Sequence, residues 1–193
     1  MNTSDKVDIA QVGEDVLLQP SMVVEDPSSD RIKRLAQAMK ATLVSIDAIA
    51  MAAPQLRAAD RVFVFHLPTH RIPSGARTAP VPWTVAVNPV VEPLTDRKQL
   101  LWERCLSVPL LFGRVPRPAR IRLQYQDLDG ADHEMLASGF LANVLQHEQD
   151  HLDGVLYMSR LQNPLDLAAE RVLCGNSRFY PYTSSEFDGP AGD

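Results

Sequence analysis

The amino-acid sequence predicts an α+β domain in which antiparallel sheets surround a central helix. Segments rich in β-branched and aromatic residues lie on both sides of one helical segment, residues 138–153. This segment carries two histidines four positions apart, and an apolar stripe runs along the same face. The strands do not alternate one by one with helices, as they do in domains built on a parallel sheet.

The first predicted helix follows a polar, proline-containing stretch. Ser28, Ser29 or Asp30 can cap its N-terminus, and the helical pattern ends near Asp47. Between these points apolar side chains recur at helical spacing: Ile32, Leu35, Met39, Leu43 and Ile46.

Four strands are predicted from composition and alternation. RVFVFH (61–66) and WTVAVNPVVE (83–92) are rich in β-branched and aromatic residues, and the Pro-rich stretch 68–82 between them is expected to be a surface loop. Residues 121–137 are expected to form a β-hairpin, because apolar and polar side chains alternate before the turn signal Asp129-Gly130.

The C-terminal part is predicted to contain one short helix. Asn163 and Pro164 supply a cap and a first-turn proline, so the helix should run from about residue 165 to 173 and stop at Gly175. The segment SSEFDGPAGD has the composition of a disordered chain. We therefore expect one catalytic domain over residues 1–175 and a flexible tail over residues 176–193.

Composition and charge argue against several function classes. The 193 residues contain no uncharged apolar run long enough to cross a membrane, and MNTSDKVDIAQ lacks the apolar core of a signal peptide. We expect a cytoplasmic protein without membrane partners. The formal net charge is -5, so no specific nucleic-acid binding is expected. Four arginines form at most a local basic patch on a solvated strand edge: Arg114, Arg117, Arg120 and Arg122.

The central helix contains the pattern His-Glu-x-x-His in QHEQDHLDG (146–154). Ser138 is expected to cap this helix and Gly154 to end it. His147 and His151 project from the same helical face and can converge on one metal ion, while Glu148 can reach water at that ion without being a ligand. The histidines share an apolar stripe with two other side chains, so they point inward and need partners: Phe140 and Val144.

A catalytic site of this kind commonly has a third protein ligand, and two residues compete for that place. Glu170 lies 19 residues after His151, a separation typical of thermolysin-type proteases, although a helical glutamate is more often a solvated residue. Cys105, in ERCLSVP, offers a thiolate that suits a borderline or soft divalent metal. With only one other cysteine, Cys174, the chain has no disulfide framework.

Three ordered motifs resemble the signature motifs of peptide deformylases: MAAPQ (51–55), ERCLS (103–107) and QHEQDH (146–151). The resemblance covers roughly residues 8–165, and it favours Cys105 over Glu170. It implies a fold with antiparallel sheets around a central helix, and a hydrolase that removes the N-formyl group from formyl-methionine at the start of new polypeptides.

The resemblance also implies roles for particular residues. Cys105, His147 and His151 would hold one divalent ion, with Fe²⁺ expected and Zn²⁺ or other ions as alternatives. Glu148 would act as general base and then general acid, and the Gln55 amide and the Leu106 backbone N–H would stabilise the oxyanion. A nascent chain would be the partner, with a transient ribosome contact at most. Six residues are expected to contact the substrate: Ile49, Ala50, Arg104, Phe112, Phe140 and Val144.

The sequence departs from the family pattern around the expected site. Ala48 and Ala50 replace two glycines of the first motif, and Arg104 replaces the glycine of the second. Phe112 stands where relatives often carry an arginine, and Asn143 replaces a larger residue. Three alternatives therefore stay open: a paralogue that acts on another N-formyl compound, a thermolysin-type protease that uses Glu170, and a binding protein that keeps the fold.

Overall fold

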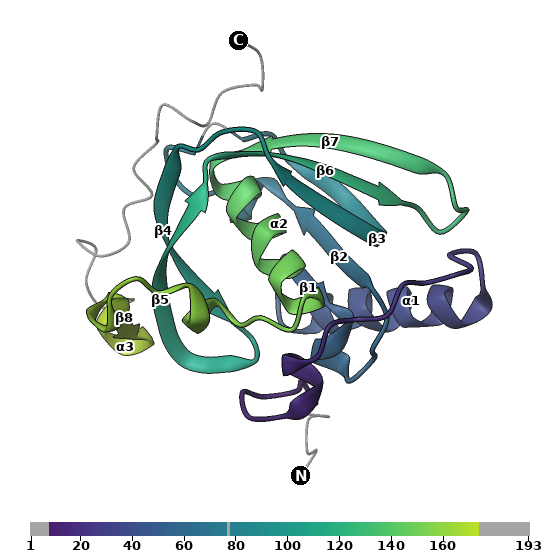
Figure 1. Ribbon diagram of the computed structural model, residues 1–193, viewed down its shortest axis with the longest axis horizontal. Coiled ribbons are helices and arrows are strands. Elements are labelled where there is room, and N and C mark those ends of the chain that lie inside the picture. The colour runs from purple at the N-terminus through teal and green to yellow at the C-terminus, as the bar shows by residue number, and fades with distance from the viewer. Residues whose placement is uncertain (1–7, 77, 174–193) are drawn as a thin grey trace.

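The computed structural model describes residues 8–76 and 78–173, and Figure 1 labels its elements. The α-helices are α1 (Asp30–Ser45), α2 (Gly139–Leu152) and α3 (Glu170–Leu173). The strands are β1 (Ala50–Ala52), β2 (Val62–Leu67), β3 (Val81–Pro93), β4 (Lys98–Cys105), β5 (Val108–Pro118), β6 (Arg120–Gln126), β7 (Asp132–Ser138) and β8 (Leu167–Ala169). The 3₁₀ helices are η1 (Asp15–Leu18), η2 (Ala53–Leu56), η3 (Thr69–Arg71), η4 (Tyr157–Arg160) and η5 (Pro164–Asp166).

Two antiparallel sheets flank α2, as Figure 1 shows. The larger sheet has five strands in the order β1-β2-β3-β6-β7, and the smaller has three in the order β4-β5-β8. Helix α2 contacts strands of both sheets, whereas α1 contacts β1 and β2. The predicted α+β class, with antiparallel sheets around the helix that carries both histidines, is confirmed.

Strand β2 shows how the sequence places the two helices on opposite faces of the larger sheet. Val62 and Val64 belong to the cluster that also contains the buried face of α1, while Phe63 and Phe65 pack in the cluster that contains α2. Successive side chains of a strand point to opposite faces, so alternate residues serve different cores. Each fully buried side chain of this size stabilises the fold by about 1.5–3 kcal/mol.

The first helix and the hairpin form where the sequence predicts them. In α1, Ser29 takes the N-cap position, but its side chain makes no capping bond and its hydroxyl donates instead to the Asp26 carbonyl. Strands β6 and β7 pair around a turn in which Gly130 has a φ of +81°. Ser138 likewise takes the N-cap position of α2 without capping it.

The predicted terminal helix over residues 165–173 is wrong. Asn163 does accept a hydrogen bond from the Leu165 N–H, but the turn that it caps is only the 3₁₀ helix η5. The chain then forms β8, which pairs with β5, before the single turn of α3. Pairing with the open edge of β5 satisfies the backbone groups of residues 167–169, so tertiary context outweighs local helix propensity here. Gly175 and the predicted tail lie outside the described residues.

None of the helices in the described ranges has the length and apolar character needed to cross a bilayer.

Candidate metal centre and substrate cavity

Helix α2 presents its histidines to the interior because it is covered on most sides. Eleven of its fourteen residues are buried. His147 and His151 lie one turn apart, and their rings approach edge to face with centroids 5.0 Å apart. As the sequence predicts, both rings point inward, where each polar atom needs a partner.

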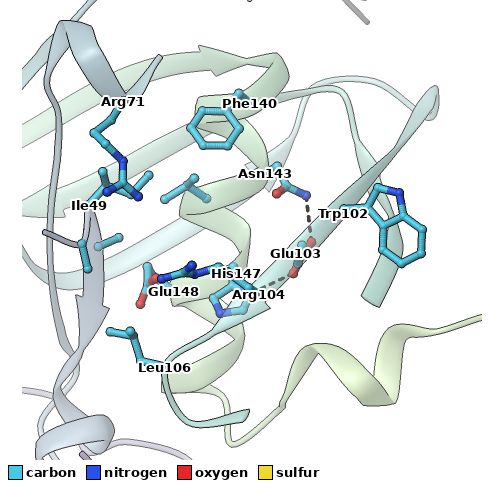
Figure 2. A pocket seen from close by; sticks show the side chains of 13 residues that line it. Ile49, Arg71, Trp102, Glu103, Arg104, Leu106, Phe140, Asn143, His147 and Glu148 are labelled. Carbon is cyan, nitrogen blue, oxygen red and sulfur yellow. Dashed lines mark hydrogen bonds and ion pairs between the residues drawn. The ribbon is translucent and has the colours of Figure 1, made fainter. Parts of the chain in front are cut away.

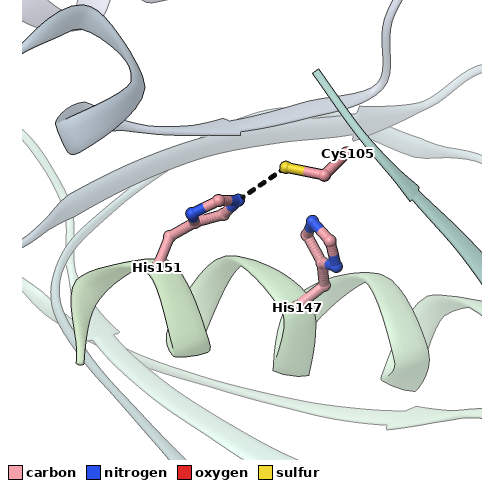
Figure 3. Close-up of side chains that lie close together, drawn as sticks. All are labelled: Cys105, His147 and His151. Atoms are coloured by element: carbon pink, nitrogen blue, oxygen red, sulfur yellow. Dashed lines mark hydrogen bonds between the residues drawn. The ribbon is translucent and has the colours of Figure 1, made fainter. Parts of the chain in front are cut away.

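Strand β4 brings Cys105 to this pair of rings. Cys105 Sγ lies 3.1 Å from His151 Nε2 and accepts a hydrogen bond from the Ser107 N–H at 3.4 Å. Figure 3 shows the sulfur between the two imidazoles that rise from α2. One donor atom from each of the three residues lies within 4.8 Å of the others. Burial alone would raise the pKa of the Cys105 thiol, but His151 and His147 hold it well below its usual range.

This donor set fits a divalent metal ion. One thiolate and two imidazole nitrogens suit a metal of borderline softness, and three protein ligands leave a position open for water or substrate. Within the described ranges this is the one group of three or more His, Cys, Asp or Glu residues close enough to share an ion. Catalytic metal sites have this composition, whereas structural sites usually close the fourth position with protein.

Glu103 fixes the orientation of one ring. Its buried carboxylate lies 2.8 Å from His147 Nδ1. Burial acts to raise the pKa of Glu103, but the Arg117 guanidinium lowers it to about 2, so the carboxylate is ionised and accepts the Nδ1–H. The other nitrogen, Nε2, is then free to bind a metal. The sequence contained a signal for this role, because Glu103 and Cys105 lie two apart on a strand and share a face.

A buried ionic network supports Glu103 from behind. Arg117 donates to Glu103 through Nε and Nη2, at 2.5 and 2.9 Å, and its Nη1 donates to Asp150 at 2.8 Å. Arg160 also donates to Asp150, at 2.7 Å. Of the four arginines that could have formed a local basic patch, Arg117 is buried within this network, and Arg114 and Arg122 pair with carboxylates.

Glu148 lies beside the donor group without belonging to it. Its side chain is buried, and its Oε2 has no hydrogen-bond partner among the described residues. Burial raises the pKa of Glu148 to about 7. The residue lines the same cavity as His147 (Figure 2). A buried carboxylate of this kind can exchange a proton with a molecule in the cavity near neutral pH.

Gln55 approaches the centre from η2. Its side-chain oxygen accepts the Ala52 N–H at 2.9 Å, which fixes the amide plane. Its Nε2 donates to Ser107 Oγ at 3.2 Å and lies 3.8 Å from Cys105 Sγ. The side chain is 2% exposed. The structure thus places a rigid amide donor next to the Cys105 sulfur.

Comparison with known proteins agrees with this geometry. Residues 6–166 match the family model described as polypeptide deformylase. Peptide deformylase 1 of Nitrosomonas europaea is 37% identical over 155 residues, which cover 80% of this chain and 87% of that protein. The chain belongs to the polypeptide deformylase family.

Solved deformylase structures have the same fold. A peptide deformylase from Synechococcus elongatus in complex with actinonin superposes with a TM-score of 0.74 at 31% identity, covering 86% of this chain and 84% of that one. A class I type b peptide deformylase from Acinetobacter baumannii with bound Met-Ala-Ser gives 0.72 at 33% identity, covering 79% and 96%. These likenesses favour metal-dependent deformylation over the thermolysin-type and binding-protein alternatives.

The position of Glu170 agrees with the family assignment. Its Oε1 lies 3.6 Å from Arg104 Nη1, and it is not part of the group that can share an ion. The alternative in which Glu170 supplies the third ligand is therefore not favoured. The residue sits in α3, whose turn follows β8 and so lies against the smaller sheet rather than against α2.

A cavity of about 150 Å³ opens beside His147 and Glu148. Four apolar residues expected to contact the substrate line it: Ile49, Ala50, Phe140 and Val144. Arg104 and Leu106 line it as well (Figure 2). Five further lining residues were not among the six expected substrate contacts: Ala48, Arg71, Trp102, Glu103 and Asn143.

Phe112 does not line this cavity. Its side chain is 2% exposed on β5, where its backbone faces Arg104 on one side and Ala168 on the other. Phe112 instead lines a neighbouring depression together with Arg104 and Leu106. Its contact with the bound peptide stays a prediction.

Proposed function

We propose that this chain is an active, metal-dependent peptide deformylase that hydrolyses the formyl group from N-terminal formyl-methionine of new polypeptides and releases formate. The observation that carries the proposal is the buried Glu148 carboxylate, with one oxygen unpartnered among the described residues, beside Cys105, His147 and His151 at a partly apolar cavity. A purely structural metal site needs neither the carboxylate nor the cavity.

Amide hydrolysis at this site requires a strong nucleophile and stabilisation of the developing oxyanion, because resonance makes a formamide carbon weakly electrophilic. When bound by Cys105, His147 and His151, a divalent metal supplies Lewis acidity toward water and toward the carbonyl oxygen. Glu148 accepts the proton of the attacking water and then gives it to the departing amine nitrogen. Its position on α2, one residue after His147, puts the carboxylate at the cavity wall.

Gln55 and Leu106 stabilise the oxyanion in this proposal. The Gln55 amide is fixed by Ala52, so its N–H groups need little reorganisation when charge develops on the formyl oxygen. Leu106 follows Cys105 directly and lines the cavity, so its backbone N–H is the second donor. The methionine side chain occupies the apolar part of the cavity between Ile49, Phe140 and Val144.

We further propose Fe²⁺ as the native ion and the cytoplasm, with transient ribosome contact, as the place of action. The sulfur and nitrogen donors support iron but also accept zinc and other divalent ions. Metal analysis of protein purified without oxygen tests the first point: iron should be present at one ion per chain, and zinc alone with full activity would overturn it.

Substrate class is tested by comparing formyl-Met-Ala-Ser with single formylated amino acids and small formamides. We expect the peptide to be hydrolysed with the highest kcat/KM, because a second depression next to the cavity, which shares Arg104 and Leu106 with it, gives room for further residues. Stoichiometric metal with turnover only of non-peptide formamides would overturn the nascent-chain assignment and favour a paralogue with another N-formyl substrate.

A further inference from the structure

Two guanidinium groups from separate elements lie at the wall of the substrate cavity. Arg104 comes from β4 and Arg71 from η3, and both line the cavity (Figure 2). The two lining carboxylates are buried, Glu148 beside the donor group and Glu103 within its network with Arg117, Asn143 and His147. The charged groups at the outer wall of the cavity are therefore the two guanidinium groups, and their carboxylate partners, Asp47 and Glu170, do not line it.

The two arginines differ in how firmly they are held. Arg71 donates through Nη1 to the backbone oxygen of Asp47 and to its carboxylate, the latter at 2.8 Å, and its side chain is 31% exposed. Arg104 is 51% exposed, and its ion pair with Glu170 is long, at 3.6 Å. Exposed pairs of this kind contribute little, so Arg104 can exchange Glu170 for another carboxylate at small cost.

Arg104 also lies between the cavity and a neighbouring depression. Together with Leu106 it lines a second depression, of about 180 Å³, which continues over Pro109 and Leu110 to Glu170. This depression shares Arg104 and Leu106 with the cavity, so it offers room for the residues that follow the methionine of a bound peptide. The bulky arginine in place of the family's glycine therefore borders both the methionine cavity and the space for those next residues.

We infer that Arg104 makes this enzyme prefer formyl-methionyl peptides with an acidic side chain in the second or third residue. The inference rests on the proposed deformylase function and adds a specificity-determining residue to it. The carboxylate of the substrate replaces Glu170 as the partner of Arg104, while the Arg71 guanidinium adds to the attraction from the other element. Both contacts lie near solvent, so added salt weakens the preference.

The test compares kcat/KM for formyl-Met-Asp-Ser, formyl-Met-Ala-Asp, formyl-Met-Ala-Ser and formyl-Met-Lys-Ser at low ionic strength. We expect the better acidic peptide to exceed the neutral one by about fivefold, as for a partly solvated ion pair, and the lysine peptide to be the poorest. Arg104→Gln should bring the ratio between acidic and neutral peptides to about one. Glu170→Gln, which removes the competing carboxylate, should increase it.

Arg122→Gln is the matched control. It removes the same charge from an arginine of β6 that pairs with Glu92 and does not line the cavity, so the ratio of kcat/KM between acidic and neutral peptides should stay at the wild-type value.

Calorimetric binding of the products Met-Asp-Ser and Met-Ala-Ser provides a readout without turnover. Met-Asp-Ser should bind more tightly than Met-Ala-Ser to the wild type, and the two should bind equally to Arg104→Gln. If the ratio of kcat/KM between acidic and neutral peptides is the same in wild type and in Arg104→Gln, the inference is overturned. Failure to hydrolyse any of the four peptides would overturn the proposed function itself.

Discussion

The proposed role of Gln55 in stabilising the oxyanion depends on its side-chain amide group. This amide is fixed by the Ala52 N–H and by Ser107, so the geometry of the donor is set before substrate binds. We expect Gln55→Ala to lower kcat by about 10²–10³-fold, the effect typical of losing one oxyanion donor. Metal content should stay at the wild-type value. Loss of metal in parallel with activity would contradict a role confined to the oxyanion.

Substitutions at Cys105 and at Glu170 are expected to have opposite effects on metal content. Cys105 Sγ lies within the group that can share an ion, whereas Glu170 pairs with Arg104. After dialysis against a weak chelator, Cys105→Ala should lose the ion, and Glu170→Ala should retain one per chain, as measured by elemental analysis. The reverse pattern would restore a thermolysin-type ligand set.

At the scale of elements, the contact between β5 and η4 depends on Gly113. A Cβ at this position would lie 2.5 Å from Cε2 of Tyr157, whose ring is buried and stacks on His147 with centroids 6.1 Å apart. Gly113→Ala should lower the free energy of unfolding by about 1–3 kcal/mol, as in other overpacked cores. Urea unfolding measures this change. Gly130→Ala is a useful comparison, because its cost comes from its positive φ while its Cβ meets no atom within 4 Å.

The network between β4, β5 and α2 predicts a dependence of stability on pH. The pKa of Glu103 in the folded protein is about 2, below the ordinary value of 4.5, so its stabilising effect is present above the ordinary value and is lost as pH falls toward 2. A difference of one in pKa between the folded and unfolded states corresponds to about 1.4 kcal/mol. The difference in unfolding free energy between wild type and Glu103→Gln should therefore narrow by about 2 kcal/mol between about pH 6 and about pH 3. A constant difference would mean that Glu103 titrates alike in both states.

For the whole molecule, the sequence predicted the parts of the fold that depend on local patterns. Helix α1, helix α2 and the β6–β7 hairpin follow from helical spacing, alternation and the turn signal at Asp129-Gly130. The small sheet was not predicted, because β4 and β5 have irregular polarity, β5 contains several prolines, and β8 forms only when β5 offers an edge.

The candidate site was predictable to a similar extent. The motif residues Cys105, His147, His151 and Gln55 come together as the resemblance implies. Arg71 and Trp102 could not be assigned to the cavity, because only the tertiary fold brings η3 and β4 to the end of α2.

The central claim is that Glu148 transfers protons for amide hydrolysis at a metal site built by Cys105, His147 and His151. It is tested most directly by measuring formate release from formyl-Met-Ala-Ser and metal content in the same samples of wild type and Glu148→Gln. We predict one ion per chain in both proteins and a loss of kcat of about 10²–10⁴-fold in the variant. Equal turnover by both proteins, at equal metal content, would contradict the claim.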